Sequence, residues 1–181
     1  MTDEARNAGV ADFTALLNFL SETPNKLANF TEGLSAAEFR WQNSPDEFSA
    51  LENICHLRDL ELQGYTPRIK RCITEDDPAL ADFDGARVAA ESNYHNEQPR
   101  IAQQMFLTAR RENVETLRAL TEKQLEREAT LAGVGKITLR RLAKMMREHD
   151  EGHLEDLRVL RQRIDARREI SESEPGAVAT G

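Results

Sequence analysis

Two histidines, His149 and His153, have the spacing of a metal-binding pair inside a long segment with helical periodicity. Residues four apart lie on one face of an α-helix, so both imidazoles can bind one metal ion. Apolar residues recur around them at steps of three and four: Leu139, Leu142, Met146, Leu157, Leu160 and Ile164. Because the histidines take places within this apolar stripe, we expect them to face the interior. The pattern indicates a metal site or, alternatively, two hydrogen-bonded core histidines.

A metal site needs at least a third ligand, and the other histidines of the chain are His56 and His95. His56 belongs to a helical segment that begins near Ser49, and it lies at the edge of that segment's apolar arc, which weakens the argument from the residues alone. His95 follows Tyr94 in a polar segment, and we interpret it as a surface residue or as a hydrogen-bonding partner of a ligand. His56 is therefore the candidate that completes the site.

Four long helical patterns, separated by turn-forming residues, must position these histidines, and we find no convincing alternating strand pattern. We expect helices over about residues 10–30, 49–73, 97–126 and 137–168, with a short one near 85–91. Pro24 predicts a kink or break in the first helix, and Pro67 predicts a bend just before it in the second. Ser49 and Glu52 form a capping box, and Thr138 is the expected cap of the fourth helix. The lengths predict an all-α four-helix bundle.

Three charged residues could act near such a site. Arg110 shares a helix face with Phe106, so its guanidinium either reaches the edge of the core or forms a buried pair with a carboxylate such as Glu52. Glu52 and Asp150 are candidate acid–base groups or hydrogen-bonding partners beside the metal. The capping role of Glu52 competes with this function, and Asp150 fits a solvated charge equally well.

The composition is that of one globular domain, with 181 residues of which 39% are hydrophobic and 31% charged. We expect a single domain over residues 1–170 and a disordered tail over 171–181. A formal net charge of −8 disfavours nucleic-acid partners. Neither a signal peptide nor an apolar stretch of the roughly 20 residues that cross a bilayer is found, so we expect a cytoplasmic protein without a membrane partner. Cys55 and Cys72 are expected to be buried, inert thiols.

A set of short motifs extends from Phe48 to about Leu160. The motifs are Phe48-Ser49-Ala50-Leu51-Glu52 followed by His56-Leu57, Asn93-Tyr94, Phe106-x-x-x-Arg110, Gly135-x-x-Thr138-Leu139 and His149-Asp150-x-x-His153-Leu154. Together they resemble the DinB-like superfamily, metal-binding four-helix bundles that include YfiT-type proteins and thiol-dependent S-transferases. Phe48 stands where that family more often has tryptophan, a change that preserves packing and leaves the histidines untouched.

The resemblance implies a metal site with a defined set of ligands. In that family the ligands are one histidine on the second helix and a pair four residues apart on the fourth, which correspond to His56, His149 and His153. Three nitrogen ligands leave coordination positions open for water or a substrate thiolate. Such a site suits a divalent ion such as Zn²⁺, Ni²⁺ or Fe²⁺.

Three functions remain open on this basis. The resemblance favours a metal-dependent thiol S-transferase that activates a low-molecular-weight thiol toward an electrophilic substrate. A metal-dependent hydrolase would use the same ion to activate water, and it would need a positioned base. A non-enzymatic, stress-related metal- or ligand-binding protein is the third alternative. We also expect a homodimer, because family members commonly dimerise and because the apolar arc of the second helix is broader than one bundle core requires.

Overall fold

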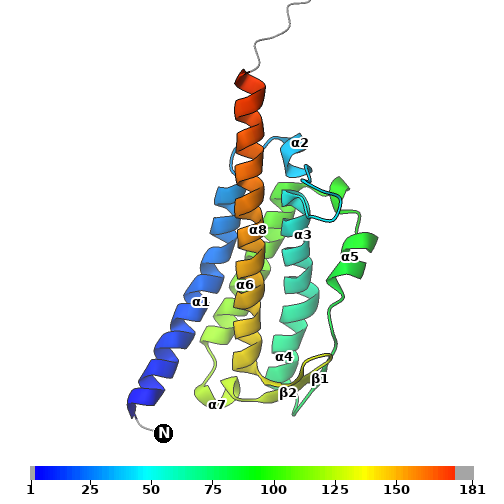
Figure 1. Ribbon diagram of the computed structural model, residues 1–181. Coiled ribbons are helices and arrows are strands. Elements are labelled where there is room, and N and C mark those ends of the chain that lie inside the picture. The colour runs from blue at the N-terminus through cyan, green and yellow to red at the C-terminus, as the bar shows by residue number, and fades with distance from the viewer. Residues whose placement is uncertain (1–2, 174–181) are drawn as a thin grey trace, which may run out of the picture.

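The protein folds as a bundle of four long helical rods, seen in a computed structural model that describes residues 3–173 (Figure 1). The rods are α1 (Asp3–Thr31), the continuous run of α3 (Ala50–Asp59), η1 (Leu60–Tyr65) and α4 (Thr66–Thr74), α6 (Pro99–Arg118), and α8 (Leu139–Ser173). Short helices α2 (Ala36–Phe39), α5 (Gly85–Glu91), η2 (Tyr94–Asn96) and α7 (Glu122–Leu125) lie in the connections. Both α1 and α3 pack against α6 and α8. The predicted four-helix bundle is therefore confirmed.

The second rod begins at the predicted capping box and contains a π-helical segment. The backbone N–H of Glu52 donates to Ser49 Oγ at 3.2 Å, and the Ser49 N–H donates to Glu52 Oε2 at 2.8 Å. Further along, the Thr66 N–H donates to the carbonyl of Glu61, a wider turn than that of an α-helix. A wide turn relieves the clash between the Pro67 ring and the preceding turn. The irregularity expected before Pro67 is therefore the π-helix η1.

The expected break at Pro24 and the expected start of the C-terminal tail need correction. Helix α1 continues through Pro24 without a break. A proline leaves the carbonyl four residues earlier without its usual donor, and here Arg110 Nη1 donates to the carbonyl of Leu20 at 3.4 Å. Helix α8 begins with the predicted cap, since the Arg141 N–H donates to Thr138 Oγ1 at 3.2 Å. It runs to Ser173, so the first three residues of the expected tail are helical, and 174–181 lie outside the described residues.

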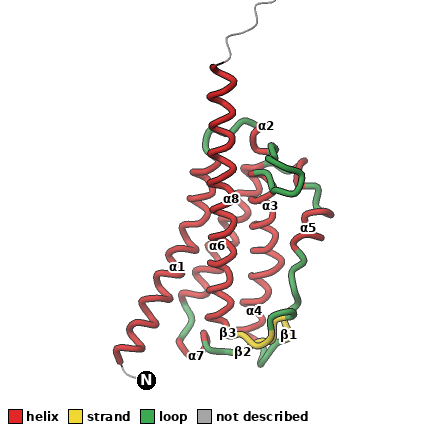
Figure 2. The backbone as a smooth tube through the Cα atoms, viewed as in Figure 1, coloured by secondary structure: helices red, strands yellow, loops and turns green. Residues whose placement is uncertain are grey.

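The absence of strands was a wrong prediction, because the structure contains a small three-stranded sheet beside α4 and α7 (Figure 2). Strand β1 (Ala79–Leu80) pairs in parallel with β2 (Glu128–Leu131), which pairs antiparallel with β3 (Gly135–Thr138). Segments this short show little alternation in sequence. In addition, the third helix ends at Arg118 and not near residue 126, which leaves room for β2.

Helix α5 and the residues after it cover the second rod. Val88 of α5 is buried, and Tyr94 is buried with its hydroxyl donating to Asp59 Oδ2 at 2.9 Å. Leu51, Ile54 and Cys55 form one buried cluster with Tyr94. Most of the broad apolar arc of the second helix is therefore buried within the chain, although Leu62 is 37% exposed, which weakens the arc as an argument for a dimer. Among residues 3–173, no helix has the length and apolar character of a membrane span.

Candidate metal centre

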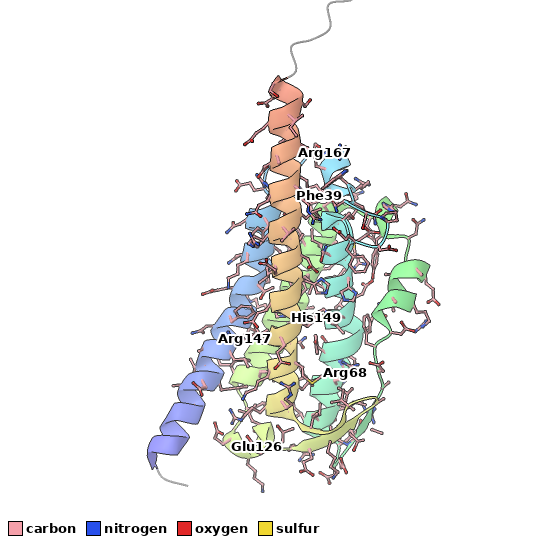
Figure 3. The ribbon with its side chains drawn as sticks, in the orientation of Figure 1. Phe39, Arg68, Glu126, Arg147, His149 and Arg167 are labelled. Carbon is pink, nitrogen blue, oxygen red and sulfur yellow. The ribbon has the colours of Figure 1, made fainter. Side chains whose placement is uncertain are left out.

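The structure brings His56, His149 and His153 together between α3 and α8. The Nε2 atom of His149 lies 3.2 Å from Nε2 of His56 and 3.2 Å from Nε2 of His153. Figure 3 shows His149 midway along α8, beside the α3 rod. One ligand atom from each ring lies within 4.8 Å of the others, and no other group of this kind is found among the described residues. The three predicted site residues thus share one small volume across two helices.

Asn53 fixes the orientation and tautomer of His153. Its Nδ2 donates to the carbonyl of Ser49 at 3.0 Å, so its Oδ1 faces His153 Nδ1, 2.7 Å away. An amide oxygen only accepts, and Nδ1 of His153 must therefore carry the hydrogen. In a neutral ring the lone pair then lies on Nε2, toward the other two histidines. Sequence reasoning missed Asn53, although an asparagine one helical turn before His56 was the available signal.

His56 is held by close packing on both sides. Its ring centroid is 5.6 Å from that of Phe48 and 6.2 Å from that of Phe83. The backbone of Gly85, at the start of α5, approaches so closely that a Cβ there would lie 2.6 Å from His56 Cε1. The ring is 8% exposed, more deeply buried than its place at the edge of the apolar arc indicated. Gly85 therefore makes room for His56 and was not recognised in the sequence.

Burial keeps the three imidazoles neutral. Desolvation, followed by the neighbouring His153, lowers the pKa of His56 to about 4. Desolvation also lowers the pKa of His149 to about 3, with smaller contributions from His153, His56 and Arg110. The pKa of His153 is lowered by the same burial. Neutral rings present lone pairs at neutral pH, which is the protonation state that a metal ligand needs.

The donor set fits a divalent ion. With bonds of about 2.0–2.1 Å and tetrahedral angles, two nitrogens on one zinc ion would be roughly 3.3 Å apart, close to the separations at His149. Without a cation, neutral rings allow His149 Nε2 at most one well-aligned N–H···N bond, although it contacts two ring nitrogens. The Nδ1 atoms of His56 and His149 are also buried without partners among the described residues, but they lie on the side of each ring away from the facing Nε2 atoms, so an ion there would not contact them. A cation among the three Nε2 atoms would satisfy all three lone pairs.

A buried ionic cluster adjoins the triad through Asp150, the neighbour of His149. Arg110 bonds to both carboxylate oxygens of Asp150, one of them through Nη2 at 3.0 Å, and the same Nη2 donates to Glu61 Oε2 at 2.8 Å. Asn113 Nδ2 donates to the other Glu61 oxygen at 2.7 Å. Arg110 is 1% exposed, and Glu61 and Asp150 are 0% exposed. The predicted buried pairing of Arg110 is present, but its partners are Glu61 and Asp150.

The other candidates lie away from the three facing nitrogens. The side chain of His95 is 53% exposed, and its Nε2 is 3.8 Å from Glu52 Oε1. Glu52 caps α3 and accepts a bond from Gln42 Nε2 at 2.9 Å. Asp150 is buried in the ionic cluster, so its interpretation as a solvated charge was wrong. Cys55 and Cys72 are free and buried, and burial raises the pKa of the Cys55 thiol to about 12.

A cavity of about 520 Å³ borders the triad at His153. Its wall comes from the loop before α3, from Asn53 and from about three turns of α8 that begin at His153. Its remaining lining residues are Asp46, Glu47, Phe48, Asp156, Val159, Leu160 and Arg163. His153 is the member of the triad that lines this cavity.

The sequence matches the DinB superfamily over residues 20–157, more than half of the chain, and the protein belongs to this family. Among solved structures, it is similar to YfiT from Bacillus subtilis, described as a probable metal-dependent hydrolase with an unusual four-helix bundle topology. That likeness has a TM-score of 0.78 at 19% identity and covers 91% of this chain and 90% of the YfiT chain. It establishes the fold. The comparison with curated proteins gave no match.

Proposed function

We propose that His56, His149 and His153 bind a divalent metal ion and that the site activates a low-molecular-weight thiol for transfer to an electrophile. The observation that carries the proposal is the convergence of three neutral Nε2 atoms from two helices. When bound, an ion such as Zn²⁺, Ni²⁺ or Fe²⁺ would supply the Lewis acidity that lowers the pKa of a coordinated thiol. The histidines orient this centre, and Asn53 holds His153 in the required tautomer.

The engagement of Glu52 and Asp150 in other contacts supports a reaction that uses neither of them as a base. Glu52 is engaged in the capping box, and Asp150 is engaged by Arg110 inside the core. Both carboxylates that the sequence offered as bases therefore have structural partners. A thiol whose pKa has been lowered loses its proton to solvent, and its sulfur then attacks the electrophile while the leaving group departs. A hydrolase is the second candidate, favoured by the description of YfiT as a probable metal-dependent hydrolase.

The first test is elemental analysis of protein purified without a histidine tag. We expect about one metal ion per chain in the wild type and in His95→Ala, because His95 lies outside the triad. We expect His56→Ala, His149→Ala and His153→Ala to lose the ion. If the wild type holds no metal even after reconstitution with Zn²⁺, Ni²⁺ or Fe²⁺, the histidines are core residues and the proposal fails.

The loaded protein is then tested for turnover with 2-mercaptoethanol and monochlorobimane, and separately with 4-nitrophenyl acetate. Thioether formation that is lost in His149→Ala supports the transferase. Ester cleavage lost in the same variant, without thioether formation, supports the hydrolase. A loaded protein inactive in both assays favours the non-enzymatic metal-binding alternative.

Metal affinity is expected to change by less than about tenfold between pH 7.0 and 5.5. The lowered pKa values of His56 and His149, about 4 and about 3, keep protons from competing with the ion in this range. Three histidines with an ordinary pKa near 6.5 would lose roughly several hundredfold in affinity over the same interval. Competition titration with a chelating dye calibrated at each pH measures this difference. A loss of several hundredfold would contradict the neutral, desolvated site.

Gly85→Ala is expected to weaken metal binding by about 10–100-fold, the usual effect of disturbing a residue that orients a ligand. The new Cβ would meet His56 Cε1 at 2.6 Å and Nδ1 at 3.2 Å, and the ring is packed against Phe48 and Phe83. Gly152→Ala is the matched control, because a Cβ at that position of α8 meets nothing within 4 Å. It should leave affinity unchanged. Equal affinities of the two variants by calorimetry would show that His56 moves freely.

We retain the homodimer and the cytoplasmic location as further proposals. With most of the apolar arc of the second helix covered, the main support for the dimer comes from Ile101 and Met105, which lie one turn apart on α6 and are 51% and 43% exposed. Light scattering over a range of concentrations tests this, and a monomer throughout would exclude it.

A further inference from the structure

The cavity beside His153 is lined by more acidic than basic residues. Three of its lining residues are acidic, Asp46, Glu47 and Asp156, and one is basic, Arg163. Arg163 Nη1 donates to Glu47 Oε2 at 2.7 Å, so these two charges balance each other. Within residues 3–173, by contrast, Asp46 and Asp156 form neither an ion pair nor a side-chain hydrogen bond. The cavity therefore retains two carboxylates without a cationic partner.

The local environment of Asp156 agrees with this excess of negative charge. Its pKa is raised, chiefly by partial burial and then by the nearby carboxylates of Glu155 and Glu47. The smaller contribution, from the two neighbouring carboxylates, reflects a negative potential at Asp156, and a negative potential favours a cation over an anion.

Apolar side chains, together with Asn53 and His153, form the rest of the wall. Phe48, Val159 and Leu160 line the cavity, and the Phe48 ring also packs against His56 at 5.6 Å between centroids. Asp156 lies one helical turn beyond His153 on α8, and Leu160 lies one turn further on. Along α8, the ligand His153 is thus followed first by the carboxylate of Asp156 and then by the apolar side chain of Leu160.

We propose that this cavity binds a thiol substrate that carries an ammonium group on a short apolar chain, and that it discriminates against anionic thiols. The sulfur would lie toward His153, and the cationic group would lie beside Asp156 and Asp46. The triad and the adjoining cavity define the site, and the two carboxylates define its selectivity. This inference rests on the proposed binding of a thiol at the triad.

The test compares two thiols of similar length and opposite charge, thiocholine and 2-mercaptoethanesulfonate. They are titrated into the full chain loaded with Co²⁺, whose sulfur-to-metal charge-transfer absorption reports thiolate binding. For each protein, the affinity for thiocholine is divided by the affinity for 2-mercaptoethanesulfonate. This ratio is then compared between the wild type and a variant, because the difference in intrinsic acidity between the two thiols cancels in the comparison. We expect Asp46→Asn/Asp156→Asn to reduce the preference for thiocholine by about tenfold, as suits two partly exposed charges.

Asp12→Asn is the control, because Asp12 is an exposed acid on α1 outside the cavity wall. It should leave the ratio unchanged. The wild-type preference should also shrink as the salt concentration rises. Equal ratios in the wild type and the double variant, with both thiols bound, would overturn the charge selectivity while leaving thiol binding intact.

A second arm separates this inference from the proposed function. Choline and 3,3-dimethylbutan-1-ol have nearly the same shape and differ in charge, and neither needs a thiol to bind. Their contact with the Val159 and Leu160 methyl groups is followed by NMR in the zinc-loaded protein. If choline binds and the alcohol does not, and if no thiolate absorption is seen in the first arm, the cation-binding pocket is supported and the proposal that it binds a thiol fails. No preference for choline would overturn the pocket even if thiols bind the metal.

Discussion

Replacing Arg110 with methionine is expected to lower the free energy of unfolding by about 3–5 kcal/mol, the usual cost of leaving a buried charge without its partner. Arg110 lies between Glu61 on η1 and Asp150 on α8, and all three side chains are at most 1% exposed. Its removal leaves two carboxylates in the core without a cation. The substitution also removes the hydrogen-bond donor to the Leu20 carbonyl, which cannot accept a bond from Pro24 because proline has no N–H.

Arg111→Met is the matched control for this change. Arg111 is the next residue on α6, its side chain is 75% exposed, and it pairs with Glu115 at 2.9 Å. An exposed pair of this kind contributes about 0–1 kcal/mol. For a domain of this size, the loss at Arg110 corresponds to a fall in Tm of roughly 6–20 °C. Calorimetry and urea denaturation measure both variants, and equal stabilities would refute the ionic cluster as a structural element.

A triple variant tests whether the uncompensated carboxylates are the cause. Adding Glu61→Gln and Asp150→Asn to Arg110→Met neutralises both acids while keeping their shape. Because replacing a whole buried ion cluster is far less costly than removing one partner, part of the lost stability should return. If the triple variant is less stable than Arg110→Met alone, packing of the Arg110 side chain, including its position over the Phe106 ring, carries the effect.

The residues that could be predicted from the sequence are those whose role depends on their spacing from residues nearby in the chain. The four-residue step between His149 and His153 and the capping box from Ser49 to Glu52 are local patterns, and the structure contains both. The bundle follows from apolar periodicity in the same way. The start and end of α5 at residues 85 and 91 also agree with the turn chemistry of Asp84, whose carboxylate accepts from the Arg87 N–H at 2.9 Å.

The residues that were missed act through contacts between distant segments. Nothing local distinguishes Glu61 from Glu52 as the partner of Arg110, since the choice depends on how η1 lies against α6. Gly85 leaves room for His56 only because α5 folds over that ring, although the two residues are 29 positions apart in the chain. Strands β1 and β2 pair residues that are 51 positions apart, such as Ala79 and Thr130, and neither strand is long enough to show alternation by itself. Packing between helices decides such contacts, and spacing along one helix does not.

Zinc is expected to raise the free energy of unfolding of the wild type by about 4 kcal/mol when free zinc is 1,000 times its Kd, because it binds the folded state. That increment corresponds to a rise in Tm of roughly 8–16 °C. His149→Ala should abolish it, since Nε2 of His149 is the atom that faces both other ligands. His95→Ala should retain it in full. The increment is compared within each variant, so any effect of the substitution on the metal-free fold cancels.

Removal of the ion is expected to leave the helical fold in place. The largest buried apolar cluster joins α1, α6 and α8 through residues such as Leu20, Leu117 and Met146, which pack without any contribution from a metal ion. The metal would therefore add to a core that is already formed, unlike a zinc finger, whose fold requires the ion. Circular dichroism of chelated protein should show unchanged helix content with a lowered Tm. Loss of helix on chelation would instead make the ion structural and would favour the non-enzymatic alternative over the transferase.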